Sequence, residues 1–134
     1  MSRFEGRVAL VTGAAGGIGR ATSMRLAAEG ATVVVNDVRP DGIDEVVELL
    51  GDRGIAGAAD VTSESEVAGL VAEVGPVDIL VNNAGGAMPG ASWSPVRDTT
   101  LADWESFLAL NLTAAFLCSR AVLPGCSPAA ADTS

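Results

Sequence analysis

Short runs of apolar and β-branched residues recur along the chain, and they have the continuous hydrophobicity of strands that are buried on both faces of a sheet. Glycine and alanine give the third run less strand preference than the others. The pattern predicts four strands, at residues 8–11, 32–35, 55–59 and 77–81.

Between these runs the apolar residues follow the 3.6-residue period of a helix. Two segments place four apolar residues each at positions i, i+3, i+4 and i+7, which form one apolar face. Apolar side chains also follow one side of residues 100–122, which we predict to be the longest helix. Ser63 followed by Glu66 is typical of a capping box before the second segment. The residues with the helical spacing are Ile43, Val46, Val47 and Leu50 in the first segment and Val67, Leu70, Val71 and Val74 in the second.

Strands that alternate with helices through short connections are typical of right-handed β-α-β units, which build a parallel sheet. We therefore predict an α/β fold. The segments follow one another without a linker in a chain of 134 residues. This arrangement predicts one domain at residues 1–124 and an irregular tail at residues 125–134.

The composition is strongly acidic, with a net charge of -9 from 17 acidic residues against 8 arginines and no lysine. This charge repels nucleic-acid phosphates and anionic membrane surfaces, so we expect neither as a partner. With no histidine and only Cys118 and Cys126, the sequence offers neither a metal-ligand cluster nor a disulfide framework. We see no signal peptide and no apolar run near membrane-spanning length, and we expect a cytoplasmic protein.

A glycine-rich segment follows the first predicted strand and opens a helix. Gly13 permits a tight turn, Gly17 permits close approach of the backbone to a pyrophosphate, and Gly19 permits the helix to pack against the sheet. The amide groups and positive dipole end of the helix favour an anion. A simple turn is the alternative interpretation. The predicted dinucleotide-binding turn includes Gly13, Ala15, Gly17, Ile18 and Gly19.

Asp37 follows the second predicted strand, where a carboxylate can accept hydrogen bonds from the adenosine ribose hydroxyls. A 2′-phosphate there would meet like charge, so we predict NAD as the cofactor rather than NADP. Arg39 would oppose this preference, although an arginine that faces solvent is the simpler interpretation. Asp37 can also be a turn residue before Pro40.

The glycine spacing Gly-x-x-x-Gly-x-Gly resembles that of the short-chain dehydrogenase/reductase family, and further matches follow in order over residues 5–124. Asp60 and Val61 resemble the pair that holds the adenine ring. The segment Asn-Asn-Ala-Gly after the fourth strand resembles the second signature of the family, and Asn111 resembles its catalytic asparagine. The resemblance adds Asp60, Val61, Asn83, Ala84 and Gly85 to the cofactor-binding residues and Asn111 as a catalytic residue.

Each of these residues also has a purely structural interpretation. Asp60 can cap the next helix, and Asn82 and Asn83 can form a turn. Asn111 can be a polar residue on a helix surface. Their occurrence together, in this order, favours the resemblance.

The resemblance implies a Rossmann-type doubly wound sheet, here incomplete, with about four strands in the order 3-2-1-4 and flanking helices. It implies an NAD-dependent oxidoreductase that, in its full-length form, transfers hydride between nicotinamide and a small-molecule alcohol or ketone. Homo-oligomers would form through the long helix. A non-catalytic nucleotide-binding or interaction module is the alternative, and a flavin or methyl-donor site fits the motifs poorly.

The family catalyses its reaction with a Tyr-x-x-x-Lys pair and an upstream serine. This sequence contains no tyrosine and no lysine. We therefore expect the chain to keep dinucleotide binding and to be inactive by itself, truncated before these residues.

The residues after Pro124 lack the strand character that the family pattern predicts there. One GC-rich encoding of the tail, read from the last base of a GGA codon for Gly125, translates as Met-Leu-Ala-Arg-Gly-Arg-Gly-His-Val, which resembles a lead into a fifth strand. We therefore expect that one base was lost at this codon. An artificial truncation or a natural short form is the alternative, and the coding DNA distinguishes them.

Overall fold

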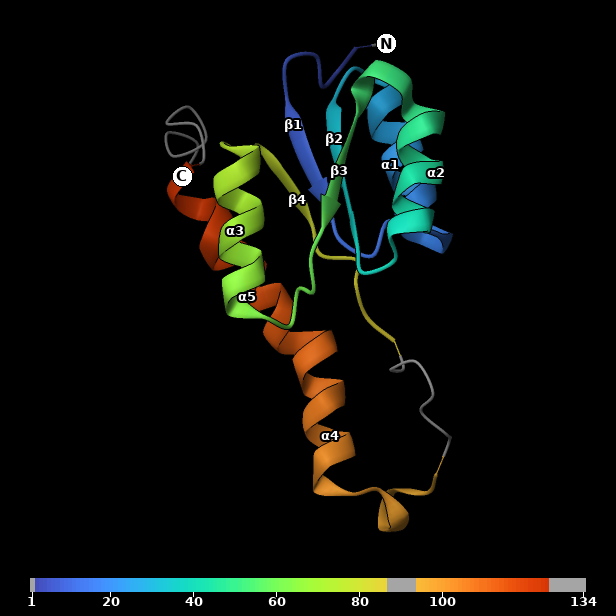
Figure 1. The fold of residues 1–134 in the computed structure, drawn as a ribbon, viewed down its shortest axis with the longest axis vertical. Helices are drawn as coiled ribbons and strands as arrows, with labels where there is room; N and C mark the ends of the chain where they lie inside the picture. Colours follow the sequence, from blue (N-terminus) through green and yellow to red (C-terminus); the bar gives the residue numbers. More distant parts are fainter. Residues whose placement is uncertain (1, 87–93, 126–134) are drawn as a thin grey trace.

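The computed structural model describes residues 2–86 and 94–125, which form a parallel sheet with helices on both faces (Figure 1). The strands lie in the order β3-β2-β1-β4, and every neighbouring pair is parallel. The predicted α/β fold and strand order are therefore confirmed. The strands are β1 (Val8–Val11), β2 (Thr32–Asp37), β3 (Gly54–Ala58) and β4 (Ile79–Val81).

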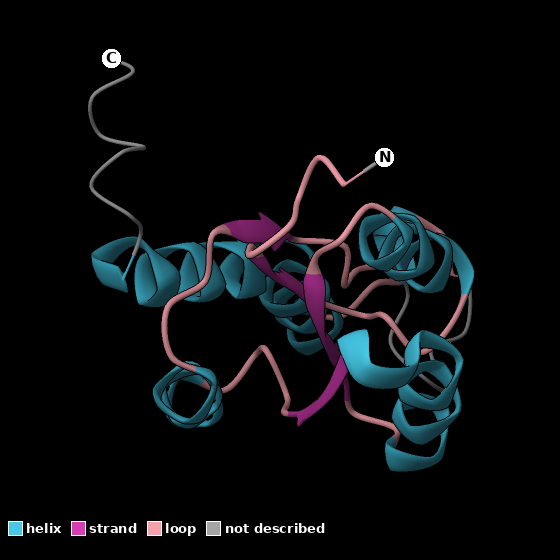
Figure 2. Cartoon of the chain, turned by 90° about the horizontal axis from the view of Figure 1, so that it is seen from above, coloured by secondary structure: helices cyan, strands magenta, loops and turns pink. Residues whose placement is uncertain are grey.

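The helices lie in two layers, one on each face of the sheet, as Figure 2 shows from above. On one face α1 and α2 cover the sheet, and α3 and α5 cover the other face (Figure 1). The helices are α1 (Gly17–Ala28), α2 (Pro40–Leu50), α3 (Glu64–Val74), α4 (Leu101–Leu108) and α5 (Ala114–Val122).

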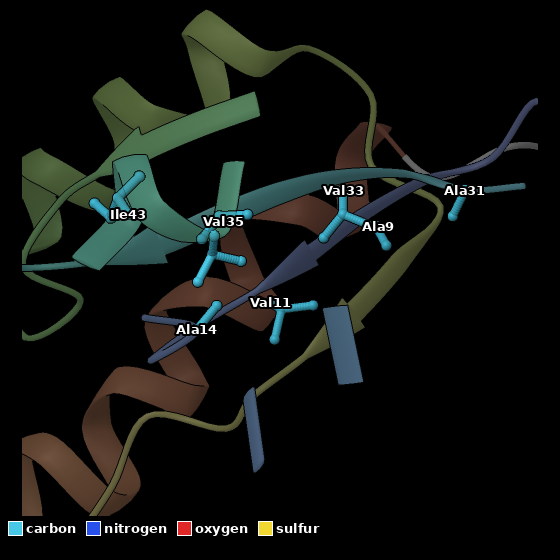
Figure 3. Close-up of a cluster of buried hydrophobic side chains, with 8 residues drawn as sticks. Ala9, Val11, Ala14, Ala31, Val33, Val35 and Ile43 are labelled. Atoms are coloured by element: carbon cyan, nitrogen blue, oxygen red, sulfur yellow. The ribbon is translucent and has the colours of Figure 1, made fainter. Parts of the chain in front are cut away.

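The strands contribute alternate side chains to two cores, because successive residues of a strand point to opposite faces of the sheet. Val11, Val33 and Val35 face α1 and α2 and pack with Ile43 in the cluster of Figure 3. Leu10, Val34, Leu70 and Val122 belong to the cluster on the opposite face. Burial on both faces explains why β1 and β2 read as continuous apolar runs.

The fourth strand is shorter than predicted and begins at Ile79 rather than Val77. Asp78 is the reason, because its Oδ2 accepts a hydrogen bond from the Val8 amide at 2.9 Å while its own amide donates to the Val8 carbonyl at 2.8 Å. Val77 is buried in the core before the strand begins. The side chain of Asp78 thus replaces one rung of the ladder between β1 and β4.

The long predicted helix is interrupted. Five residues, Ala109–Thr113, form a π-helical segment between α4 and α5. Asn111 contributes to this interruption, because its Nδ2 donates to the Phe107 carbonyl four residues earlier, at 3.0 Å, and such bonds compete with the helical ladder. Figure 1 shows α4 projecting beyond the carboxyl end of the sheet, and no residue of α4 is buried.

The helical stretch Leu101–Gly125 is long and apolar enough to cross a membrane by length and composition alone. The expectation that no apolar run approaches this length is therefore wrong. The same criterion also selects core helices of proteins that never enter a membrane, and α5 packs its buried residues against α3 and the sheet.

Candidate functional site

The glycine-rich turn lies between β1 and α1 at the carboxyl end of the sheet. Gly13 has φ +60°, and a Cβ at this residue would lie 2.9 Å from the Cα of Ala84. A Cβ on Gly19 would lie 2.5 Å from the Gly13 carbonyl oxygen. These two glycines therefore allow the turn to pack against the residues that follow β4 and against the start of α1.

Gly17 differs from its neighbours because a Cβ there would meet nothing within 4 Å in residues 2–86 and 94–125, although its φ of +55° disfavours other residues. The first turn of α1 carries no acidic residue, and its N-cap residue, Gly16, has no side chain that could accept a hydrogen bond from the helix amides. The side chain of Ile18 is 78% exposed. The first amide groups of a helix lack partners inside the helix, so this open side of the turn suits an anion.

Thr12 and Asn83 fasten this turn to the segment after β4. The hydroxyl of Thr12 accepts hydrogen bonds from the amides of Asn83 (3.0 Å) and Ala84 (2.9 Å). In return, Asn83 Nδ2 donates to the carbonyls of Thr12 and Gly13, both at 3.1 Å. The structure thus brings the two predicted motifs together, and the amide of Asn83 is engaged with the turn itself.

Asp37 ends β2 beside the same turn and is largely buried. Its Oδ2 accepts a hydrogen bond from the Ala15 amide at 3.2 Å, and its Oδ1 accepts one from the Val38 amide at 2.8 Å. The Nε of Arg39 lies 3.5 Å from Oδ1. The carboxylate therefore lies at the corner between the glycine-rich turn and the start of α2.

Asp60 and Val61 follow β3 along the same edge of the sheet. Oδ1 of Asp60 accepts hydrogen bonds from the amide (2.9 Å) and the hydroxyl (2.6 Å) of Thr62. Val61 is buried under α3 and α5. Ser63, rather than Asp60, caps α3 by accepting a hydrogen bond from the amide of Glu66. The first hydrogen bond of the predicted capping box is therefore present. The Glu66 carboxylate accepts its hydrogen bond from the amide of Asp60, however, and not from that of Ser63.

Asn111 joins the π-helical segment to the residues after β4. Its Oδ1 accepts a hydrogen bond from the Gly86 amide at 2.8 Å, and its Nδ2 donates to the Gly86 carbonyl at 2.9 Å. A Cβ on Gly85 would lie 2.9 Å from Oδ1 of Asn111. The exposed Asn111 side chain therefore holds the segment after β4 in place through two hydrogen bonds to Gly86. It is not simply a polar residue on a free helix surface.

Two buried polar residues of the site escaped the sequence reasoning, Thr12 and Asn36. Asn36 on β2 donates from Nδ2 to the carbonyls of Gly57 (2.8 Å) and Ala59 (3.2 Å). Its own carbonyl accepts a hydrogen bond from the amide of Ala14 at 2.8 Å. The sequence gives one signal for Asn36, which is a polar residue at the end of the apolar run of β2.

Among the residues that the structure describes, no group of three or more acidic, cysteine or histidine side chains could hold a metal ion.

A model of the short chain dehydrogenase family matches residues 7–130. The cis-4-hydroxycyclohexanecarboxylate dehydrogenase of Sinomonas cyclohexanicum is 43% identical over 127 residues, which cover 90% of this chain and 49% of that enzyme. The D-threitol dehydrogenase of Mycolicibacterium smegmatis is 40% identical over 129 residues, which cover 90% of this chain and 47% of that enzyme.

A solved structure from Agrobacterium tumefaciens, provisionally assigned as a gluconate dehydrogenase, superimposes with a TM-score of 0.80 at 38% sequence identity. The similarity covers 89% of this chain and 48% of that one. The chain thus spans about half the length of the curated relatives that it matches.

Proposed function

The chain belongs to the short-chain dehydrogenase family, and from this premise we propose that it supplies the NAD-binding half of an oxidoreductase acting on an alcohol or ketone. Proteins of this family bind a nicotinamide dinucleotide, whose nicotinamide ring accepts or donates hydride when bound. We propose a preference for NAD, an alcohol or ketone substrate, and a role for each residue named below. The cytoplasmic location and the exclusion of nucleic-acid and membrane partners stay predictions.

The observation that carries the proposal is the open turn before α1. Among the residues that the structure describes, nothing outside the turn itself lies within 4 Å of a Cβ at Gly17 and no side chain caps the helix, so a pyrophosphate can approach the first amides of α1. We assign this contact to the turn formed by Gly13, Ala15, Gly17, Ile18 and Gly19.

Asp37 is proposed to accept hydrogen bonds from the adenosine ribose, and its negative charge favours NAD over a dinucleotide with a 2′-phosphate. Asp60 and Val61 would flank the adenine ring at the end of β3. Asn83, Ala84 and Gly85 would line the site after β4, held by the hydrogen bonds to Thr12.

Asn111 is proposed to occupy the catalytic asparagine position of the family. Both N–H donors of its side-chain amide are used in holding Gly86 and Phe107, and its Oδ1 accepts from the Gly86 amide, which supports a positioning role for that amide. The 134 residues include no tyrosine and no lysine to exchange a proton with the substrate oxygen. We therefore propose that this chain by itself binds NAD and turns over no alcohol or ketone.

Isothermal titration of the 134-residue chain with NAD⁺ tests the binding half of the proposal. Ile18→Glu places a negative charge beside the proposed pyrophosphate and should weaken NAD⁺ at least about tenfold, while a carboxylate at this helix end favours the fold. Met24→Glu adds the same charge further along α1, at another exposed residue, and should leave affinity unchanged. Equal effects of both variants, or no binding by the unaltered chain, would overturn the assignment.

A turnover assay tests the second half. Incubation of the chain with NAD⁺ and a panel of alcohols, or with NADH and ketones, should give no change in absorbance at the nicotinamide band. Any turnover that scales with chain concentration would contradict the proposed inactivity, whatever the result of the titration.

A second proposal concerns assembly. Several large apolar side chains of the long helix are exposed, among them Trp104 (57%), Leu112 (63%) and Phe116. Exposed apolar patches of this kind mark contact surfaces. We propose that the long helix forms a homo-oligomer contact.

A further inference from the structure

We propose that the chain carries a second anion site, for a phosphate-sized oxyanion, at the end of the sheet opposite the glycine-rich turn. The guanidinium groups of Arg3 and Arg25 form this site where they converge on the carboxylate of Glu29. An open pocket of about 420 Å³ lies among these three side chains and Ala28. The proposal goes beyond dinucleotide binding, because the pocket lies at the far end of α1 from the turn.

The N-terminal segment and the end of α1 bring the two guanidinium groups together. Arg3 precedes β1, and the amide of the next residue, Phe4, donates a hydrogen bond to the Glu29 carbonyl at 2.9 Å. Arg25 lies in the last turn of α1, and Glu29 is the C-cap residue of this helix. A helix of 12 residues is about 18 Å long, and this length separates the pocket from the amides proposed to hold the pyrophosphate.

The pocket holds one more positive than negative charge. Arg3 donates to both oxygens of Glu29, and Arg25 donates to Oε1 at 2.6 Å. Two neighbouring arginines are in contrast each paired with one carboxylate. These pairs are Arg7 with Asp78 and Arg53 with Glu5. The local excess of positive charge attracts an anion, although the whole chain has a net charge of -9.

Both guanidinium groups keep N–H donors for a ligand. The side chains of Arg3 and Arg25 are 60% and 76% exposed, whereas that of Glu29 is 6% exposed. Within residues 2–86 and 94–125, Nη1 of Arg3 and both Nη atoms of Arg25 donate no hydrogen bond. Guanidinium donors match phosphate oxygens well. One tetrahedral oxyanion can therefore accept hydrogen bonds from both arginines while Glu29 holds them in place.

The carboxyl end of α1 would oppose an anion if its carbonyl groups were free, because this end of a helix carries partial negative charge. The carbonyls of residues 25–27 accept hydrogen bonds from the amides of residues 29–31. The Glu29 carbonyl is engaged by Phe4, as described above. These hydrogen bonds reduce the opposing charge of the helix end.

The alternative is that both arginines only fasten the N-terminal segment to α1 through Glu29. Loss of Arg25 would then lower the stability of the fold, and phosphate would have no effect beyond that of its ionic strength. If the pocket binds an oxyanion, phosphate changes the environment of both guanidinium groups, and loss of Arg25 weakens its binding.

Nuclear magnetic resonance of the arginine Nε–Hε groups, during titration of the ¹⁵N-labelled chain with inorganic phosphate at constant ionic strength, separates these cases. The signals of Arg3 and Arg25 should shift with one common dissociation constant. Arg25→Met retains the aliphatic stem and removes the charge. Measured at Arg3, it should raise this constant at least about tenfold, the size of one charge-assisted hydrogen bond.

Arg7→Met is the matched control, because it removes the same charge from a one-to-one pair at the same end of the sheet. This variant should leave the phosphate dissociation constant unchanged. Ile18→Glu should also leave it unchanged, because that substitution acts at the glycine-rich turn.

The inference would be overturned by unshifted signals of Arg3 and Arg25, or by equal shifts with acetate at the same ionic strength. Weakening of phosphate by Arg7→Met or Ile18→Glu as strong as that by Arg25→Met would also overturn it. None of these outcomes affects the proposed function, which the titration with NAD⁺ tests separately.

Discussion

Glu29 shows how a single buried carboxylate joins two segments of the chain. It is only 5% exposed, and Arg3 donates to both of its oxygens while Arg25 donates to Oε1 at 2.6 Å. The hydrogen bonds from Arg3 are the main reason why the pKa of Glu29 is lowered to about 2; burial acts in the opposite direction, and Arg25 lowers the pKa further. Glu29 therefore ties the N-terminal segment to the end of α1.

This pairing predicts a specific loss of stability in acid. The pKa of Glu29 lies below the ordinary value of about 4.3 for an unfolded chain, so its contribution is present above that value and is lost as the pH falls toward 2. Glu29→Gln should lower the melting temperature at pH 7 and flatten its dependence on pH between about 4.5 and 2. Thermal unfolding followed by circular dichroism across this range measures both effects.

Glu48→Gln is the control, because Glu48 is exposed on α2. It should leave the melting temperature at pH 7 near that of the unaltered chain. If the two variants lose stability with falling pH in the same way, Glu29 does not contribute as described.

The sequence predicts the positions of some residues of the site but not of others. Gly13 and Gly19 belong to a local motif whose spacing reflects the turn itself, and both lie where β1 leads into α1. Thr12 and Asn36 act through partners far along the chain, such as Asn83, 71 residues from Thr12. No periodicity marks such a residue, because its role depends on tertiary contacts. The proposed ligand contacts stay predictions.

Among the elements, α1 is positioned by the small volume of Gly19. A Cβ there would lie 2.5 Å from the Gly13 carbonyl and 2.6 Å from Nδ2 of Asn83. Gly19→Ala should therefore destabilise the fold by about 1–3 kcal/mol, the usual cost of overpacking. Urea denaturation of the two chains measures the difference.

Gly69 in α3 is the matched helical glycine, since a Cβ there meets nothing within 4 Å in the part of the chain that the structure describes. Gly69→Ala should stabilise the protein by about 0.5–1 kcal/mol, because alanine favours the helix. Destabilisation by Gly69→Ala equal to that by Gly19→Ala would contradict the role of the close contact.

The sequence predicted the existence of the elements better than their regularity. Apolar periodicity predicts the strands and the helices of the two layers, because the apolar residues that form the pattern are those buried in the two cores. The interruption at Ala109–Thr113 does not follow, because apolar periodicity alone cannot reveal that Asn111 takes the Phe107 carbonyl and holds Gly86. The hydrogen bonds between Asp78 and Val8 likewise shorten β4, and the pattern of apolar residues does not indicate them.

For the molecule as a whole, the projecting α4 is the feature that predicts behaviour in solution. This helix lies beyond the carboxyl end of the sheet (Figure 1), and its large apolar residues Leu101, Trp104, Phe107 and Leu108 are exposed. The proposed homo-oligomer should appear as a dimer or larger species in light scattering coupled to gel filtration. Trp104→Ser with Leu112→Ser should raise the dissociation constant at least about tenfold, because large buried apolar groups dominate interface energies.

Leu49→Ser, at an exposed leucine of α2, is the control and should keep the oligomer. A monomer at all concentrations for the unaltered chain, or equal weakening by the control, would argue against a contact through the long helix.

The hydrogen bonds between Thr12 and Asn83 also set an order of events during synthesis of the chain. The first turn, α1 and Asp37 lie within the first 37 residues, so this unit leaves the ribosome early. The hydroxyl of Thr12, just before the glycine-rich turn, can accept its hydrogen bonds from Asn83 and Ala84 only after Ala84 has emerged. Until then the glycine-rich turn of the nascent chain lacks these hydrogen bonds, and the segment that follows β4 completes them.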